Sequence, residues 1–130
     1  VWVSNHGGRQ LDHGQGTMEF LPEIVEAVQG KAEILLDGGI LRGSDVIKAL
    51  AIGADAVAIG KLQGWGLAAA GISGLIRTLE ILEAEIRIAM GLLGITSFKQ
   101  ISPAYICKAD VVNLPNEMSA WPHITGGQIL

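Results

Sequence analysis

The stretch Ser4-Asn5-His6-Gly7-Gly8-Arg9-Gln10-Leu11-Asp12 decides the fold, because polar, glycine-rich sequence here abruptly ends a short apolar run. That run, residues 1–3, predicts a buried strand. At the strand's end the stretch places an acid/base group, His6, and a fixed cation, Arg9. Two glycines between them let the backbone bend around a ligand. A purely structural turn needs the glycines but has no use for both His6 and Arg9, although either one alone is more often a structural or surface residue.

The composition describes one domain that buries a substantial core. The chain has 130 residues, of which 49% are hydrophobic and 17% charged, whereas soluble domains are typically about 25% charged. The low charge suggests surfaces that another element covers. The net charge is −4, and no cluster of Lys and Arg occurs, which argues against nucleic-acid binding.

The single cysteine, Cys107, excludes an internal disulfide and fits a reducing compartment, so we expect a cytoplasmic protein, with peripheral membrane association as an option. No uninterrupted apolar run is long enough to span a bilayer. The chain begins inside a predicted strand and without Met, so we expect a segment upstream of it. No set of His, Asp or Glu has the spacing of a metal site.

Three strand–helix units follow one another along the chain. The pattern predicts strands over residues 1–3, 32–36 and 56–59, and helices over about 21–28, 44–52 and 73–93. Pro22 is expected in the first turn of its helix, and Ser44 as the N-cap of the next. In the long third helix, an apolar stripe from Leu75 to Met90 is expected to face the core. Residues 101–130 read as a C-terminal tail after a domain of residues 1–100, with a short helix near 104–108.

Continuous apolar strands that alternate with amphipathic helices predict an α/β fold with a parallel sheet. In each unit, polar and glycine residues follow the strand: Asp37, Gly38 and Gly39 after the second, and Gly60 and Lys61 after the third. Ligands bind at this end of the strands in α/β sheets and in (β/α)₈ barrels. A whole barrel takes about 250 residues, so we expect this chain to supply the C-terminal part of one.

Three blocks together resemble the FMN-dependent 2-hydroxy acid dehydrogenases and oxidases of the L-lactate, glycolate and mandelate types. They are the stretch from Ser4 to Asp12, the stretch from Asp37 to Ala54, and Ala58-Ile59-Gly60-Lys61 with Gly66-Leu67-Ala68 beyond it. The first block is the most specific, because other phosphate-binding barrels have similar Asp-Gly-Gly turns. The resemblance covers residues 1 to about 101 and implies barrel strands six to eight.

The resemblance also implies roles for individual residues. His6 would be the base that takes a proton from the substrate, and Arg9 would hold the substrate carboxylate through its two-pronged guanidinium group. Asp37, Gly38 and Gly39 would follow the ribityl chain and phosphate of FMN, and Gly60 and Lys61 would form a second phosphate-binding pair. The activity implied is oxidation of an L-2-hydroxy acid to the 2-oxo acid.

Two positions depart from the family pattern. Leu41 stands where the family has an Arg that reaches the FMN phosphate, and Lys61-Leu62 stands where the family has Arg-Pro. Lys61 keeps the charge but not the bidentate geometry. The resemblance therefore implies weaker FMN binding. The first five barrel strands, and the carboxylate that orients the base, are not among these residues.

Two hypotheses stay open at this point. In the first, the chain is part of an enzyme. In the second, it is an inactive half-barrel that binds phosphate or flavin weakly, or that forms a homo-oligomer through its exposed barrel edges. His13 and His123 have no partner that the sequence suggests, and Trp2, Trp65 and Trp121 are expected to be packing residues.

Overall fold

In the computed structural model, which describes residues 1–10 and 14–109, three parallel strands form one sheet in the order β1-β2-β3. The strands are β1 (Trp2–Val3), β2 (Leu35–Leu36) and β3 (Ala56–Val57). The register pairs Trp2 with Leu35 and Leu35 with Ala56. The predicted α/β fold with parallel strands is confirmed, although each strand is shorter than predicted.

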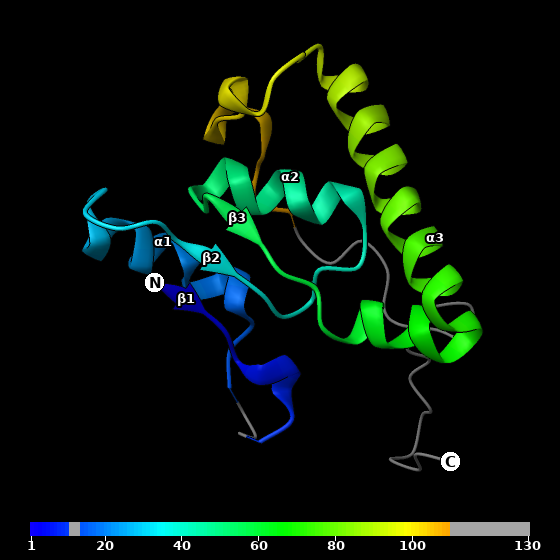
Figure 1. The fold of residues 1–130 in the computed structure, drawn as a ribbon. Coiled ribbons are helices and arrows are strands. Elements are labelled where there is room, and N and C mark those ends of the chain that lie inside the picture. The colour runs from blue at the N-terminus through cyan, green and yellow to red at the C-terminus, as the bar shows by residue number, and fades with distance from the viewer. Residues whose placement is uncertain (11–13, 110–130) are drawn as a thin grey trace.

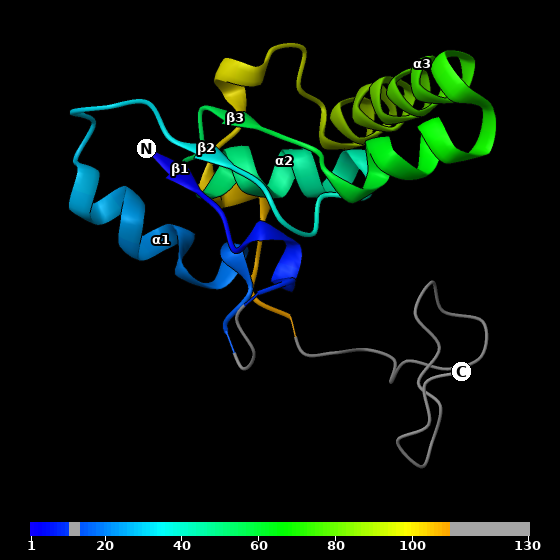
Figure 2. The same cartoon turned by 60° about the horizontal axis from the view of Figure 1, so that its bottom comes forward.

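The helices are α1 (Thr17–Val28), α2 (Gly43–Ile52) and α3 (Lys61–Leu93), and the short turns are η1 (His6–Gly8), η2 (Phe98–Gln100) and η3 (Pro103–Tyr105). Figures 1 and 2 show α1 and α2 on the same side of the sheet. The core lies between them and the sheet, where Val3 and Leu36 pack with Leu21 and Ala49. Most of the predicted tail, residues 110–130, lies outside the described residues.

The opposite face of the sheet is not covered by a helix of the described residues. The side chains alternate along each strand, so Val3, Leu36 and Val57 face the core while their neighbours face the other way. On that second face Trp2 is 62% exposed, Ala56 is exposed and Leu35 is half-buried. Parallel sheets are normally covered on both faces, so this face is one that a full fold would bury.

Helix α1 begins at Thr17, four residues before the predicted start, because a tertiary contact anchors its first turn. The Thr17 hydroxyl lies 2.7 Å from the carbonyl oxygen of Asp37 and 3.0 Å from that of Gly38, and Thr17 is buried. Pro22 consequently lies inside the helix and not in its first turn.

Helix α2 also begins earlier than predicted, at Gly43, with Arg42 and not Ser44 as its N-cap residue. The Asp45 carboxylate accepts the backbone N–H of Arg42 at 3.0 Å and that of Leu41 at 3.2 Å. These bonds fix the segment just before the helix, and the first-turn N–H of Gly43 donates to Oε2 of Glu85 at 2.7 Å, so the helix does not need Ser44 as its cap.

Helix α3 starts at Lys61, well before the predicted residue 73, and kinks at Ala70 and Gly71. The two segments meet at Gly66 and Gly74, where a Cβ on either glycine would collide with the backbone of the other. The predicted apolar stripe faces the core only in part, since Leu82 is buried but Leu79 is 49% exposed. The helix has the length and mean hydropathy of a membrane-crossing helix, with 11% of its most apolar window buried, a feature that the sequence prediction did not anticipate.

Candidate functional site

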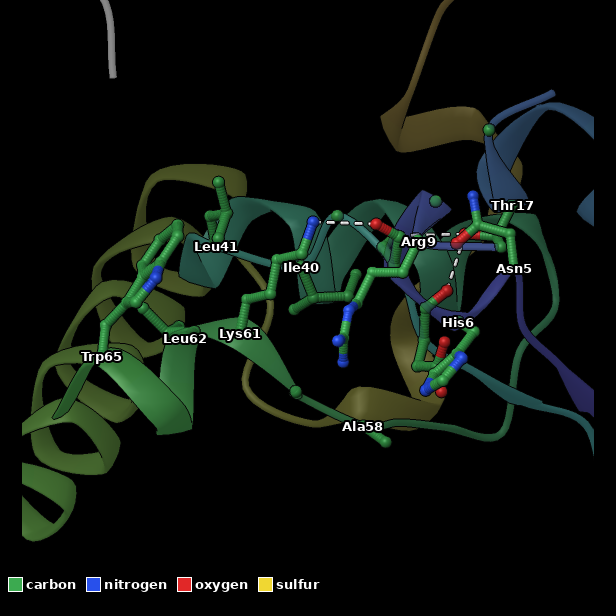
Figure 3. Close-up of a pocket in the computed structure, with 17 residues that line it drawn as sticks. Asn5, His6, Arg9, Thr17, Ile40, Leu41, Ala58, Lys61, Leu62 and Trp65 are labelled. Atoms are coloured by element: carbon green, nitrogen blue, oxygen red, sulfur yellow. Dashed lines mark hydrogen bonds between the residues drawn. The ribbon is translucent and has the colours of Figure 1, made fainter. Parts of the chain in front are cut away.

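All seven residues that the sequence singles out line one cleft of about 600 Å³ at the carboxyl ends of the three strands. They come from three loops: His6 and Arg9 after β1, Asp37, Gly38 and Gly39 after β2, and Gly60 and Lys61 after β3. In Figure 3 the Arg9 side chain lies between Lys61 and His6. Carboxyl ends of parallel strands share one edge of the sheet, which is why residues so distant in sequence meet.

His6 sits in the turn η1, whose backbone is left-handed at three successive residues. The φ angles are 53° at His6, 65° at Gly7 and 70° at Gly8. Glycine adopts such angles without penalty, but a residue with a Cβ does so at a cost, and such residues concentrate at functional sites. The turn holds the exposed His6 ring at the edge of the cleft.

The His6 turn is supported by polar neighbours that the sequence analysis did not identify. The Ser4 hydroxyl accepts the His6 backbone N–H at 3.1 Å, and Oε1 of Gln10 lies 3.2 Å from Nδ1 of the His6 ring. When Nδ1 carries the ring proton, this contact leaves Nε2 as the proton acceptor. The spacing of four residues between His6 and Gln10, across a glycine turn, is the signal that could have suggested the pair.

Asp37 connects the ends of β1 and β2. Its carboxylate accepts the Ser4 hydroxyl at 2.6 Å and the Trp2 indole N–H at 3.0 Å. Trp2, expected to be a packing residue, is therefore an exposed hydrogen-bond donor as well. Each carboxylate oxygen has a second lone pair, so Asp37 still has acceptor capacity toward the cleft.

The two glycines after β2 differ in their surroundings. Gly38 and Gly39 have φ angles of 88° and 86°. A Cβ at Gly38 would lie 2.8 Å from Oδ1 of Asn5, a buried oxygen without a hydrogen-bond partner, whereas a Cβ at Gly39 or Gly60 would meet no atom within 4 Å. Gly38 therefore packs against the protein, while Gly39 and Gly60 leave open space in which a ligand can approach the backbone.

Besides Arg9, two cations at or near the cleft, Lys61 and Arg42, behave differently. Lys61 lines the cleft, and its ammonium group donates to the carbonyl oxygen of Gly7 at 2.8 Å. Arg42 turns away, because its Nε donates to Oε1 of Glu85 on α3 at 2.8 Å. The resemblance described above leads us to expect an arginine at position 41, where this chain has Leu41. Arg42 does not take the place of that arginine, and Leu41 itself lines the cleft.

Further cleft residues are ones to which the sequence analysis gave no role in the site, although several lie in the quoted blocks. They are Asn5, Gly16, Thr17, Ile40, Ala58, Leu62 and Trp65. Trp65, expected to be a packing residue, is 45% exposed and lies with Leu41 and Leu62 at the same end of the cleft (Figure 3). Among residues 1–10 and 14–109, no group of three or more His, Cys, Asp and Glu could hold a metal ion.

Comparison with known proteins finds relatives that share this region. L-lactate oxidase from Nostoc sp. is 53% identical over 106 residues, which make up 82% of this chain and 29% of that protein. 2-Hydroxyacid oxidase 1 from Homo sapiens is 52% identical over 108 residues, which are 83% of this chain and 29% of that protein. The chain thus spans less than a third of the length of these relatives.

Solved structures agree with the sequence relatives. Mandelate oxidase in complex with 3,3-difluoro-2-hydroxy-3-phenylpropionic acid matches with a TM-score of 0.75 at 51% identity, over 79% of this chain and 31% of that one. A mandelate oxidase variant with a monooxide FMN adduct matches with a TM-score of 0.72 at 54% identity, over 76% of this chain and 32% of that one. A family model for FMN-dependent dehydrogenases matches residues 1–108. Since that match covers all three strands and every loop of the cleft, this chain belongs to the FMN-dependent dehydrogenase family.

Proposed function

We propose that this chain is the part of an FMN-dependent oxidoreductase that holds the acid/base group, the substrate carboxylate and the flavin phosphate. The reaction is oxidation of an L-2-hydroxy acid of the lactate, glycolate or mandelate class to the 2-oxo acid. The observation that carries the proposal is that His6, Arg9 and the glycine turns after β2 and β3 line one cleft. Relatives about half identical to the chain are lactate, 2-hydroxyacid and mandelate oxidases.

The three strands are proposed to be strands six to eight of a (β/α)₈ barrel. Their parallel order β1-β2-β3, with α1 and α2 on one face of the sheet, is that of consecutive barrel units. The cleft lies at the carboxyl ends of the strands, which is the active end of such barrels. The uncovered face that carries Trp2 would then face the barrel interior.

The residues of the cleft fit FMN. Gly39 and Gly60 leave room for a phosphate or ribityl group to reach the backbone, and Lys61 supplies positive charge beside Gly60. Asp37 has lone pairs left for a ribityl hydroxyl. Because Leu41 replaces a cation and Arg42 pairs with Glu85, we expect the phosphate to be held less tightly than in relatives that keep both arginines.

His6 and Arg9 have different roles toward the substrate: Arg9 binds it and His6 removes a proton from it. Arg9 would bind the substrate carboxylate through two parallel N–H donors. A carboxylate held in this way would orient the α-carbon of the substrate toward the base, His6. Nε2 of His6 would accept one proton from the substrate. When bound, FMN would take up the two electrons and the second hydrogen. The Gln10 contact at Nδ1 would keep the ring in the tautomer that this step needs.

A chimera tests the proposal in a whole barrel. Residues 1–108 of this chain replace the matching segment of the Nostoc L-lactate oxidase, and anaerobic loss of flavin absorbance is followed with L-lactate, glycolate and mandelate. We expect at least one acid to reduce the flavin. His6→Ala should slow reduction about 10²- to 10⁴-fold while flavin stays bound, and Arg9→Lys should mainly weaken substrate binding.

The control in the chimera is Arg77→Lys, an exposed change on α3 away from the cleft, which should leave the rate unchanged. The proposal fails if the chimera binds flavin but none of the three acids reduces it.

A second function is favoured by the uncovered sheet face and the two free strand edges. As a separate 130-residue molecule, the chain would be an inactive fragment that binds flavin weakly and associates through that face. FMN titration of the isolated chain, followed by fluorescence, tests this: a dissociation constant as low as that of the chimera would contradict it.

A further inference from the structure

The contact between Lys61 and Gly7 joins the loops after the first and third strands. Nζ of Lys61 donates to the carbonyl oxygen of Gly7 at 2.8 Å, across 54 positions of sequence. The lysine stem also runs along the turn, since a Cβ on Gly7 would lie 3.2 Å from Cε of Lys61. Lys61 therefore contacts the turn through both its ammonium group and its aliphatic stem. The dashed line from Lys61 in Figure 3 marks the hydrogen bond of the ammonium group.

The peptide unit between Gly7 and Gly8 is held at both ends. Its carbonyl oxygen accepts from Lys61, and its N–H, which belongs to Gly8, donates to the carbonyl oxygen of Asn5 at 3.0 Å. Hydrogen bonds on the two ends of one peptide polarise and strengthen each other. Only Gly7 separates this peptide from His6, so its orientation determines where the left-handed turn directs the His6 ring.

The turn needs such support because its conformation is costly. His6 has a Cβ and yet a φ of 53°, a region that costs an L-residue roughly 1–2 kcal/mol. Ser4 and Gln10 support His6 from within the same segment. Lys61 adds a support from the opposite edge of the sheet, fixed to the start of α3.

We infer that Lys61 is a positioning residue for His6, which it orients by holding the Gly7 carbonyl. The inference rests on the proposed function, in which His6 is the base. The same side chain can still face an anion: an ammonium group carries three N–H donors, so the bond to Gly7 leaves two for an anion in the cleft.

The test measures amide hydrogen exchange of Gly8 by NMR in the 130-residue chain. Lys61→Met removes the charge but keeps most of the stem, and it should speed exchange of the Gly8 amide about threefold to tenfold, the effect expected when an ordinary solvent-exposed hydrogen bond is lost. Amides of the core, such as that of Ala49, should keep their rates. Lys61→Arg should restore part of the protection.

The matched control is Lys48→Met, which removes an exposed lysine whose ammonium group lies 3.4 Å from Asp45. It should leave the Gly8 amide unchanged. The inference is overturned if Lys61→Met leaves Gly8 exchange unchanged, or if it speeds core amides by the same factor, which would indicate general destabilisation.

A kinetic readout separates positioning from phosphate binding. In the chimera saturated with FMN, Lys61→Met should lower the rate of flavin reduction at saturating acid about tenfold, with little change in the half-saturating acid concentration. An unchanged rate with weaker FMN binding alone would overturn the inference. A different outcome is that none of the three acids reduces the flavin of the unsubstituted chimera, while Lys61→Met still speeds exchange of the Gly8 amide. The proposed function then fails, but the role of Lys61 in holding the turn stands.

Discussion

At the scale of single residues, the glycine turn after β2 shows two different reasons for a glycine. Gly38 and Gly39 share nearly the same left-handed backbone, with φ angles of 88° and 86°. Only Gly38 is also enclosed, by Asn5 at 2.8 Å and Thr17 at 3.1 Å from the position of a Cβ. Backbone strain is thus common to both positions, while steric exclusion is specific to one.

This difference predicts unequal effects of alanine at the two positions. Gly39→Ala should lower the free energy of unfolding by about 1 kcal/mol through strain alone. Gly38→Ala should cost about 2–3 kcal/mol, because the methyl group also displaces packed neighbours. Urea unfolding followed by tryptophan fluorescence measures both, and equal losses would show that Asn5 and Thr17 move aside freely.

At the scale of elements, the contact between α2 and α3 depends on one acidic side chain and one glycine. Oε2 of Glu85 accepts the backbone N–H of Gly43 at 2.7 Å, and Oε1 accepts from Arg42 at 2.8 Å. A Cβ on Gly43 would lie 2.5 Å from the backbone nitrogen of Ile86. The carboxylate of α3 therefore caps the first turn of α2, where it also meets the positive end of the helix dipole.

The capping contact predicts that Glu85→Ala lowers the free energy of unfolding by about 1–2 kcal/mol, since a backbone donor and a cation lose their partner. Glu83→Ala is the matched control on the same helix. Glu83 pairs only at the surface with Arg87, with side-chain exposures of 62% and 76%, and should cost less than about 0.5 kcal/mol. Similar losses for both variants in thermal unfolding would contradict the capping role.

At the scale of the whole molecule, two of the exposed apolar regions among residues 1–10 and 14–109 are placed to take part in association. One is the sheet face with Trp2, and the other is the outer side of α3, where Ile88 and Leu92 are 63% and 85% exposed. β1 and β3 are the first and last strands in the sheet order, so each has an edge that no strand of the described residues pairs with. Such surfaces normally mark an interface.

We therefore predict that the isolated chain self-associates in a concentration-dependent way, as sedimentation velocity would show. Replacing both Ile88 and Leu92 with Ser should weaken the association without lowering stability much, since neither side chain is buried. Replacing Arg77 and Glu80, an exposed ion pair on the same helix, with Ser is the control. A monomer at every concentration would refute the prediction.

Sequence alone determined the three strand–helix units, their parallel arrangement and seven of the residues that line the cleft. Apolar runs of strand length and the polar residues directly after them are local features, and parallel strands bring their carboxyl ends together. These two regularities suffice to place His6, Arg9 and the glycines of the later loops at one edge of the sheet. The roles assigned to them stay predictions, as do the boundary between domain and tail and the cytoplasmic location.

Only the tertiary structure decided where the helices begin and which partners the cations take. Thr17 reaches carbonyl oxygens 20 and 21 positions away, Arg42 a carboxylate 43 positions away, and Lys61 the Gly7 carbonyl 54 positions away. A local pattern gives the propensity of a segment but not the atoms that folding brings beside it. For that reason the chain extends α1 to Thr17, directs Arg42 away from the cleft, and places Lys61 on the turn that carries His6.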